Sequence, residues 1–349
     1  MTRSSASAEA VLDAVAERRE QVNEAIEEEL PIHRPEQLYE ASRHLLDAGG
    51  KRLRPAVLLL VGEALIDAEP TKTEYRQFPT LDGEEIDLMA AAVSIEIIQS
   101  FTLIHDDIMD DDDLRRGVPA VHREYDLEMA ILAGDTLYST AFEVMLRTGA
   151  KPERSLKALQ RLANTCTKIC EGQAFDVGFE RRTDVTVEEY LEMIELKTAV
   201  LYGAAASVPA MLLGADEETV ASLYGYGIDV GRGFQIQDDV LDLTTPSERL
   251  GKQRGSDLIE GKRTLITLHA REQGVDVDEL IDSDDRESVS EVEIEAAVER
   301  LQEVGSIGFA RDRATGLIDR GKERLSVLPD NESRQLLSGL ADYLIERRY

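Results

Sequence analysis

The mostly apolar segment Ile95-Glu-Ile-Ile-Gln-Ser-Phe-Thr-Leu-Ile104 runs directly into His105-Asp-Asp-Ile-Met-Asp110. A second junction of this kind joins Phe234-Gln-Ile236 to Asp238-Asp-Val-Leu-Asp242. Residues four apart share a helix face, so each D-D-x-x-D copy presents two carboxylates on one side of a predicted helix end. Carboxylates there oppose the helix dipole and repel one another, and we therefore expect a compensating cation. Hard oxygen ligands favour Mg²⁺.

The rest of the chain also predicts helices. Ala, Leu, Glu and Arg dominate, helical periodicity is widespread, and alternating β-branched runs are rare. No break is long enough to be a linker, so we expect one all-α domain over residues 1–349. The predicted helices cover residues 9–30, 55–66, 84–113, 124–148, 152–175, 187–213, 217–243, 259–272, 292–325 and 332–347.

Charge excludes some classes of partner. The chain has 70 acidic residues against 39 Lys plus Arg, a net charge of −31. No basic surface for nucleic acid or anionic lipid is expected at this charge. Only 9 of the basic residues are Lys, and an acidic, lysine-poor composition is typical of proteins from a salt-rich cytoplasm. A merely acidic protein is the open alternative. The polar N-terminal segment Met1–Glu20 predicts no signal peptide, which favours a cytoplasmic location.

One uncharged segment has the length of a short membrane span. Thr198–Ala215 has 18 residues without a charge, but it is rich in small residues and contains Pro209. A spanning helix is normally longer and more apolar. We therefore expect a helix buried inside the protein and no membrane span.

Basic residues accompany both aspartate motifs. Arg115 and Arg116 follow the first motif, and a Gly-Gly-Lys-Arg segment at residues 49–52 precedes it. Four of the nine lysines lie in or beside such glycine- or acid-marked segments: Lys51, Lys197, Lys252 and Lys262. Divalent metal together with Arg and Lys is suited to binding a diphosphate.

Six motifs occur in order between about residues 45 and 268: G-G-K-R-x-R-P, D-D-x-x-D-x-x-x-x-R-R-G-x-P, G-Q-x-x-D, K-T, F-Q-x-x-D-D-x-x-D and G-x-D-x-x-E-G-K-x-T. This set closely resembles the trans-isoprenyl diphosphate synthases, in particular archaeal-type short-chain geranylgeranyl diphosphate synthases. The resemblance implies an isoprenoid-synthase-type bundle of mostly antiparallel helices around a central cavity, usually as a homodimer.

The resemblance also implies roles for individual residues. Mg²⁺, three ions per active site, would be bound by Asp106, Asp110 and Asp238, with support from Asp107, Asp239 and Asp242. The allylic diphosphate would be bound by Arg115, Lys197, Lys252 and Lys262. Isopentenyl diphosphate would be bound by Lys51, Arg54, Gln99 and Arg116. The allylic carbon and the developing cation would lie near Gln173, Thr198 and Gln235.

The implied reaction is the Mg²⁺-dependent head-to-tail condensation of isopentenyl diphosphate with C5 to C15 allylic diphosphates. Phe101 lies five residues before the first motif, where an aromatic implies a floor for the tail cavity and a C20 product, geranylgeranyl diphosphate. Thr102 is small, unlike the residue in typical farnesyl synthases. Phe101 as a plain core residue stays open.

Other functions also stay open. Within the family these are a farnesyl or geranylfarnesyl diphosphate synthase and a non-catalytic regulatory subunit. Outside it they are a head-to-head condensing enzyme or cyclase and an acidic cation-buffering protein. The separate Lys51 and Arg54 site, which the resemblance assigns to isopentenyl diphosphate, argues against both the head-to-head condensing enzyme and the cyclase.

Salt adaptation predicts that the melting temperature rises between dilute buffer and molar KCl. At ~1 M salt the Debye length is about 3 Å, so repulsion among the surface carboxylates is screened. Thermal melts at the two KCl concentrations measure the effect. A melting temperature that stays level or falls would leave the chain as a merely acidic protein.

Overall fold

The computed structural model describes residues 6–68, 74–179, 181–247, 253–281 and 289–346, and these lie mainly in helices. The predicted all-α class is therefore confirmed. The chain forms two compact units. The first comprises Met1–Cys166, Leu201–Tyr224 and Leu325–Leu340, and the second comprises Thr167–Val200, Gly225–Arg324 and Ala341–Tyr349. A single domain over 1–349 remains a prediction.

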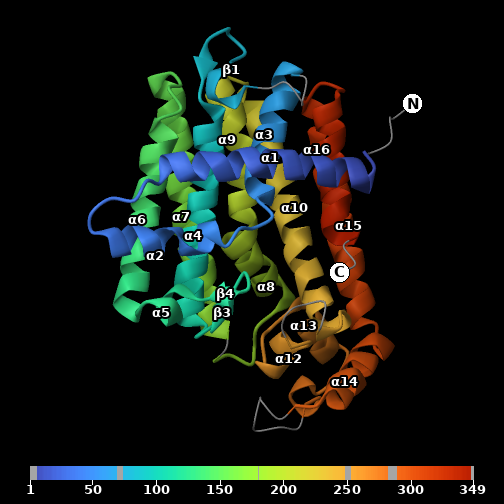
Figure 1. The fold of residues 1–349 in the computed structure, drawn as a ribbon. Coiled ribbons are helices and arrows are strands. Elements are labelled where there is room, and N and C mark those ends of the chain that lie inside the picture. Colours follow the sequence, from blue (N-terminus) through green and yellow to red (C-terminus); the bar gives the residue numbers. More distant parts are fainter. Residues whose placement is uncertain (1–5, 69–73, 180, 248–252, 282–288, 347–349) are drawn as a thin grey trace. The chain divides into compact units, whose positions relative to one another are not determined.

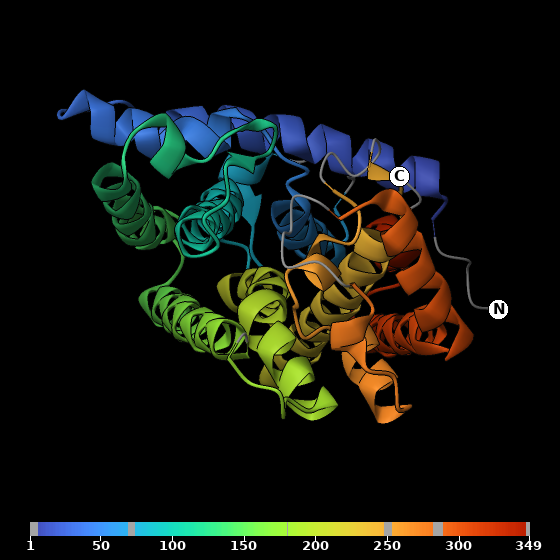
Figure 2. The same cartoon turned by 90° about the horizontal axis from the view of Figure 1, so that it is seen from below.

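The first unit consists of helices and two short hairpins. Figures 1 and 2 show α1 crossing α3 and α4, with α1 and α2 along the same side of α3, α4 and α6. The antiparallel hairpins are β1 (Phe78–Pro79) with β2 (Glu85–Ile86), and β3 (Leu114–Arg115) with β4 (Val118–Pro119). The helices are α1 (Ala8–Glu29), α2 (Glu36–Asp47), α3 (Leu53–Ile66), η2 (Tyr75–Gln77), α4 (Leu88–Met109), α5 (Val121–Glu124), α6 (Leu127–Leu146), the first part of α7 (Pro152–Phe179), nearly all of α9 (Val200–Leu213), the start of α10 (Glu217–Thr244) and most of α16 (Glu332–Glu346).

The helices α3 and α4 form the centre of the first unit's core. Every residue from Pro55 to Ala64 is buried, as is every residue from Leu88 to Ile98. Asp87 caps the start of α4 by accepting a hydrogen bond from the Ala90 amide at 2.8 Å. The helix begins later than the predicted residue 84 because Glu85 and Ile86 pair with β1.

One buried carboxylate, that of Glu63, connects α1, α3, η2 and α16 of this unit. The Arg18 guanidinium of α1 donates to Glu63 of α3 at 2.8 and 2.6 Å, and both side chains are almost completely buried. Tyr75 and Ser333 donate to the same carboxylate at 2.5 and 2.8 Å. Because each Glu63 oxygen accepts two hydrogen bonds, the buried charge is fully compensated.

The second unit contains the remaining elements. Its core is centred on α13, where Leu265, Ile266 and Leu268 belong to one buried cluster with Ile294 and Leu301 of α14. The elements are the end of α7, α8 (Val187–Ile194), the π-helical turn η3 (Glu195–Ala199), most of α10, α12 (Ser256–Ile259), α13 (Leu265–Glu272), η4 (Val277–Glu279), α14 (Glu291–Glu303), α15 (Ser306–Arg324) and the end of α16. The short helix η6 (Leu325–Val327) belongs to the first unit.

Two predicted helix ranges are interrupted in the structure, and one helix was not predicted. The range 292–325 is two helices because Gly305, with φ of 80°, breaks it. The range 259–272 is interrupted before α13, where Gly261 has φ of 73°. Helix α2 was not predicted; it starts just after Pro35 and buries only Ala41, Ser42, Leu45 and Leu46.

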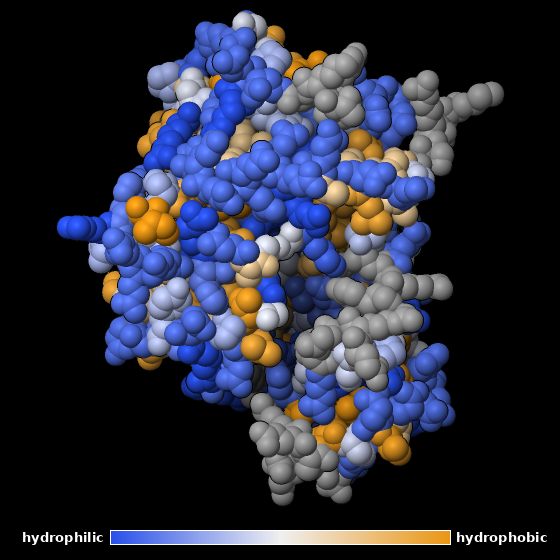
Figure 3. All heavy atoms as spheres, in the orientation of Figure 1, coloured by the Kyte–Doolittle hydropathy of each residue, from blue (hydrophilic) through white to orange (hydrophobic). Residues whose placement is uncertain are grey.

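Two stretches are long and apolar enough to cross a membrane, Leu88–Met109 and Val187–Leu213. Their most apolar windows are 83% and 78% buried inside the protein, which is typical of core helices. The predicted burial of the 198–215 segment is therefore confirmed. The face in Figure 3 is mostly hydrophilic, with small separate apolar patches, in keeping with the net charge of −31.

Candidate functional site

The first aspartate motif lies at the end of α4 in the first unit. Asp106 is half-buried in the last helical turn, and Asp110 is the exposed C-cap, whose amide donates to the Asp106 carbonyl at 2.8 Å. Asp107 is completely buried, and burial raises its pKa to about 6 although Arg115 opposes the shift. The three carboxylates therefore differ in solvation although they are adjacent in sequence.

The β3–β4 hairpin carries Arg115 back to this motif. The Arg115 Nε donates to Asp107 at 2.6 Å, and its Nη2 donates to Asp112 at 2.5 Å. Asp111 and Asp113 both pair with Arg123, at 2.7 and 2.8 Å. The aspartate run after the motif therefore holds the hairpin, whereas its sequence was also compatible with simple surface charge.

The Gly-Gly-Lys-Arg loop meets the hairpin through two arginines. Arg116 donates to the carbonyls of Leu45 and Gly49 at 2.8 and 2.6 Å. A Cβ atom on Gly50 would lie 3.1 Å from the Arg116 Cζ and 3.2 Å from an Arg52 nitrogen, and the Gly50 φ of 151° is a backbone conformation that favours glycine. The structure thus brings Arg116 beside the predicted loop.

Arg54 stacks on an aromatic side chain that the sequence did not indicate. Its guanidinium lies 4.3 Å from the centre of the buried Tyr202 ring. The Arg54 Nε is buried and has no hydrogen-bond partner among the described residues. Lys51 is exposed in the Gly-Gly-Lys-Arg loop just before α3, and Gln99 is half-buried on α4. Arg54 therefore offers an unsatisfied, oriented donor of the kind a diphosphate accepts from.

The two predicted chain-length residues lie in α4. Phe101 is 6% exposed, and its ring contacts His105 and Tyr138 at centroid distances of 5.8 and 5.3 Å. The Thr102 hydroxyl donates to the Gln99 carbonyl at 2.8 Å. Phe101 is thus anchored edge-on by aromatic neighbours rather than loosely placed.

The second aspartate motif lies in α10 of the second unit. Asp238 is half-buried, whereas Asp239 and Asp242 are buried. Asp239 accepts hydrogen bonds from Tyr190 at 2.5 Å and Gln235 at 3.1 Å. Burial, followed by the nearby charge of Asp257, raises the pKa of Asp239 well above its usual range. Asp242 accepts from the Ser256 hydroxyl at 2.8 Å, which ties α10 to α12.

Four of the predicted substrate-binding residues share one cavity of about 120 Å³ in the second unit: Lys197, Thr198, Gln235 and Lys262. The Thr198 hydroxyl donates to the Gln235 side chain at 3.0 Å. Lys197 pairs with Asp176 at 2.5 Å, and Asp176 also lines the cavity. Gln173, three residues before Asp176 on α7, is 6% exposed. Asp239 and Asp257 line the cavity as well, so its two ammonium groups lie among carboxylates as well as hydroxyl and amide groups.

A π-helical turn presents Lys197 and Thr198. The turn η3 interrupts an otherwise continuous helical stretch from α8 to α9, and such turns are frequent at functional sites. Gly172 of α7 lies against it. A Cβ atom there would come within 2.2 Å of the Lys197 amide nitrogen and 2.7 Å of the Leu196 carbonyl carbon. Only glycine therefore permits this packing.

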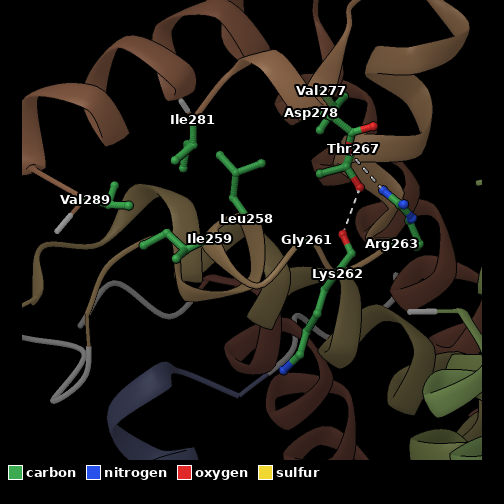
Figure 4. Close-up of a pocket in the computed structure, with 10 residues that line it drawn as sticks. All are labelled: Leu258, Ile259, Gly261, Lys262, Arg263, Thr267, Val277, Asp278, Ile281 and Val289. Carbon is green, nitrogen blue, oxygen red and sulfur yellow. Dashed lines mark hydrogen bonds and ion pairs between the residues drawn. The ribbon is translucent and has the colours of Figure 1, made fainter. Parts of the chain in front are cut away.

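Lys262 comes from the loop between α12 and α13. Figure 4 shows it extending away from the apolar side chains of Leu258, Ile281 and Val289. Its carbonyl accepts from the Thr267 hydroxyl at 3.3 Å, and its ammonium pairs with Glu260 at 3.0 Å. Lys252, which the sequence also predicted as a ligand of the allylic diphosphate, lies outside the described residues.

The carboxylates fit Mg²⁺ by their chemistry. In the described ranges, no group of three or more His, Cys, Asp or Glu is placed to hold a metal alone. Mg²⁺ usually takes only one or two carboxylates, with water and substrate phosphates completing its octahedron. Asp106 and Asp110 are such a pair, and the buried Asp107 Oδ2 has no hydrogen-bond partner among the described residues. Asp238 offers a half-buried carboxylate on the second motif.

Sequence reasoning missed several residues of the site. Asp176 is the last residue of the G-Q-x-x-D motif, so a signal for it existed. Tyr190 and Tyr202 follow no recognisable motif, because their partners Asp239 and Arg54 are 49 and 148 positions away in the sequence. Only the fold reveals such pairs.

Comparison with known proteins identifies the family of this chain. The polyprenyl synthetase family matches residues 35–301. A geranylfarnesyl diphosphate synthase of Natronomonas pharaonis is 69% identical over 98% of this chain and 99% of its own. A geranylgeranyl diphosphate synthase of Methanosarcina mazei is 49% identical over 97% of this chain and 98% of its own. The solved geranylgeranyl pyrophosphate synthetase of Geoglobus acetivorans has a TM-score of 0.84 at 44% identity, covering 95% of this chain and 99% of that one.

The chain therefore belongs to the polyprenyl synthetase family. It is an archaeal-type trans-isoprenyl diphosphate synthase, and hence a prenyltransferase, as its motifs predicted.

The packing of Gly172 on η3 predicts that Gly172→Ala lowers kcat/KM for prenyl transfer at least about tenfold, because displaced backbone misplaces Lys197. Gly178→Ala on the same helix is the matched control, since a Cβ atom there meets nothing within 4 Å. The control should keep wild-type activity and gain up to about 1 kcal/mol of stability. Steady-state kinetics and thermal melts of both variants test this prediction. If Gly172→Ala and Gly178→Ala have equal kcat/KM, the turn η3 tolerates the displacement of its backbone.

Proposed function

We propose that this enzyme condenses isopentenyl diphosphate with C5 to C15 allylic diphosphates head to tail, with Mg²⁺, and makes mainly geranylgeranyl diphosphate. The observation that carries the proposal is the single cavity shared by Lys197, Thr198, Gln235 and Lys262. Lys and amide groups around a small polar cavity suit a diphosphate next to a carbon that develops positive charge. We further propose that both units act together as one catalytic domain over residues 1–349.

The proposed roles follow the family resemblance, motif by motif. Three Mg²⁺ ions are bound by Asp106, Asp110 and Asp238. The allylic diphosphate is bound by Arg115, Lys197, Lys252 and Lys262. Isopentenyl diphosphate is bound by Lys51, Arg54, Gln99 and Arg116. The half-buried or exposed state of Asp106, Asp110 and Asp238 supports their assignment as ligands, and the buried Asp107, Asp239 and Asp242 support them from hydrogen-bonded positions.

The reaction breaks the C–O bond of the allylic diphosphate and forms a C–C bond from the isopentenyl double bond to the allylic carbon. A proton then leaves the isopentenyl C2 for the released diphosphate. Bound Mg²⁺ supplies charge stabilisation of the leaving diphosphate. The protein's own part is positioning by Lys and Arg, orientation of the cation by the Thr198 and Gln235 oxygens, and exclusion of water.

Two observations bear on product length and point to different products. Phe101 is buried and held by Tyr138 and His105, which supports a fixed floor and a C20 product. The 69% identity to a geranylfarnesyl diphosphate synthase favours the second candidate, a C25 product.

The proposal includes a cytoplasmic homodimer that works in concentrated salt and has no membrane span. Exposed apolar side chains along α6, such as Ile131, Leu132 and Leu146 at 43, 52 and 57% exposure, support a covered helix face. The burial of the two membrane-length stretches supports the absence of a span. The net charge of −31 supports a salt-rich location.

The test is to incubate the purified chain in molar KCl with labelled isopentenyl diphosphate and, separately, each of the C5, C10 and C15 allylic diphosphates. We expect Mg²⁺-dependent elongation to C20, abolished by EDTA, from a particle of twice 38.7 kDa by light scattering. A C25 main product would favour the second candidate, and C15 the farnesyl alternative. Folded protein that elongates nothing would leave the regulatory-subunit hypothesis.

Phe101→Ala should lengthen the product by one or more C5 units, because it removes the anchored ring. Loss of a buried Phe costs about 3–5 kcal/mol, so melts must accompany the product analysis. Phe142→Ala is the control: Phe142 contacts Tyr138 at 5.2 Å, and no ring contact joins it to Phe101 in the described structure. An unchanged product from folded Phe101→Ala would make Phe101 a plain core residue.

A further inference from the structure

The buried carboxylate of Glu96 has no role in any predicted motif. It lies on α4, three residues before Gln99, and is 3% exposed. A carboxylate so deeply buried among apolar helices requires cationic or hydrogen-bonding partners. The hydrogen-bond partners of Glu96 therefore indicate what this buried carboxylate does.

One oxygen of Glu96 receives two guanidinium groups. Its Oε1 accepts from Arg52 Nη1 at 2.6 Å and from Arg116 Nη2 at 3.2 Å. Arg52 is 3% exposed, and the Arg116 side chain is 18% exposed. The two cations are held close together by the one negative charge between them. Molar salt screens such buried interactions much less than exposed ones.

The backbones of both arginines are held in an unusual conformation. Arg52 and Arg116 have φ of 49° and 55°, in the left-handed region that non-glycine residues rarely adopt. Both guanidiniums also donate to carbonyls in the last turn of α2, Arg52 to Leu46 at 2.6 Å and Arg116 to Leu45 at 2.8 Å. Glu96 thus completes the attachment of two separate loops to α2 and α4.

These loops carry the groups assigned to isopentenyl diphosphate. Lys51 precedes Arg52 in the first loop, Arg54 lies in the first turn of α3 directly after that loop, and Arg116 belongs to the second loop. A shift of either guanidinium would therefore move the ammonium and guanidinium groups that bind this substrate. Effective binding of a diphosphate depends on preorganised donors.

We propose that Glu96 is a positioning residue for isopentenyl diphosphate: it holds Arg52 and Arg116 together so that Lys51, Arg54 and Arg116 present a preformed diphosphate site. It does not touch the substrate itself. This inference rests on the proposed function, because that function assigns these residues to isopentenyl diphosphate.

The experiment compares Glu96→Gln with Glu63→Gln in molar KCl. Glu63 is the matched control, since it is equally buried in the same unit and is bonded to Arg18 at 2.6 Å, whereas its side-chain hydrogen bonds within the described ranges go to Arg18, Tyr75 and Ser333 and not to either loop. Both variants should melt lower than wild type. Only Glu96→Gln should raise KM for isopentenyl diphosphate, by about tenfold, the scale of one lost charge-assisted hydrogen bond. Its KM for the allylic diphosphate should stay within about twofold.

Calorimetric titration with isopentenyl diphosphate alone gives a readout without turnover, and its Kd should follow the same pattern. Glu96→Asp keeps the charge and covers the case in which Glu96→Gln does not fold; it should bind with an affinity between those of wild type and Glu96→Gln. Unchanged Kd and KM in a folded Glu96 variant, or an equal rise in Glu63→Gln, would overturn the inference. Wild type that binds isopentenyl diphosphate without elongating it would count against the proposed function and not against Glu96.

Discussion

Buried carboxylates and the arginines that neutralise them decide which segments can meet within each unit. Arg18 draws α1 onto α3 through Glu63, and Asp229 of α10 holds Arg320 and Arg324 of α15. Each carboxylate is at most 3% exposed, so removing its partner would leave an uncompensated buried charge. Arginine suits this purpose better than lysine because its planar fork bridges several acceptors at once, which agrees with 30 Arg against 9 Lys.

The second position of each D-D-x-x-D motif is a buried aspartate, and the two aspartates have different kinds of hydrogen-bond partner. The buried Asp107 of the first motif is neutralised by Arg115, a full cation. The buried Asp239 of the second motif accepts hydrogen bonds from the neutral donors Tyr190 and Gln235. Burial, followed by the nearby charge of Asp257, raises the pKa of Asp239 well above its usual range, and the two hydrogen bonds oppose this rise. Burial also raises the pKa of Asp107, to about 6, against the opposing effect of Arg115. Motifs that are alike in sequence are therefore electrostatically distinct.

How much of the structure the sequence can predict depends on how far apart in the sequence the interacting residues lie. Apolar runs such as 88–98 and 200–213 predict buried helices, since a single stretch contains the whole signal. The helix breaks at Gly261 and Gly305 cannot be detected from hydrophobic periodicity, because a single glycine in the left-handed conformation leaves the spacing of the apolar residues intact. The lysines and the glutamine that line the second unit's cavity belong to motifs, whereas Tyr190 and Glu96 act through partners distant in sequence. The π-helical turn depends on Gly172 of another helix.

The ion pairs around the β3–β4 hairpin differ greatly in their contact with water. Arg123 and its partners Asp111 and Asp113 are 39% and 82% exposed, whereas Arg18 and Glu63 are 1% and 0% exposed. Dissolved ions weaken the exposed pairs and hardly reach the buried one. In concentrated salt the hairpin keeps the hydrogen bond from the Ala120 amide to the Asp113 carbonyl, whereas the ion pairs of Arg123 with Asp111 and Asp113 are weakened. Ionic strength thus sets how firmly the loop before Arg115 is held, while it hardly changes the buried Arg18–Glu63 pair.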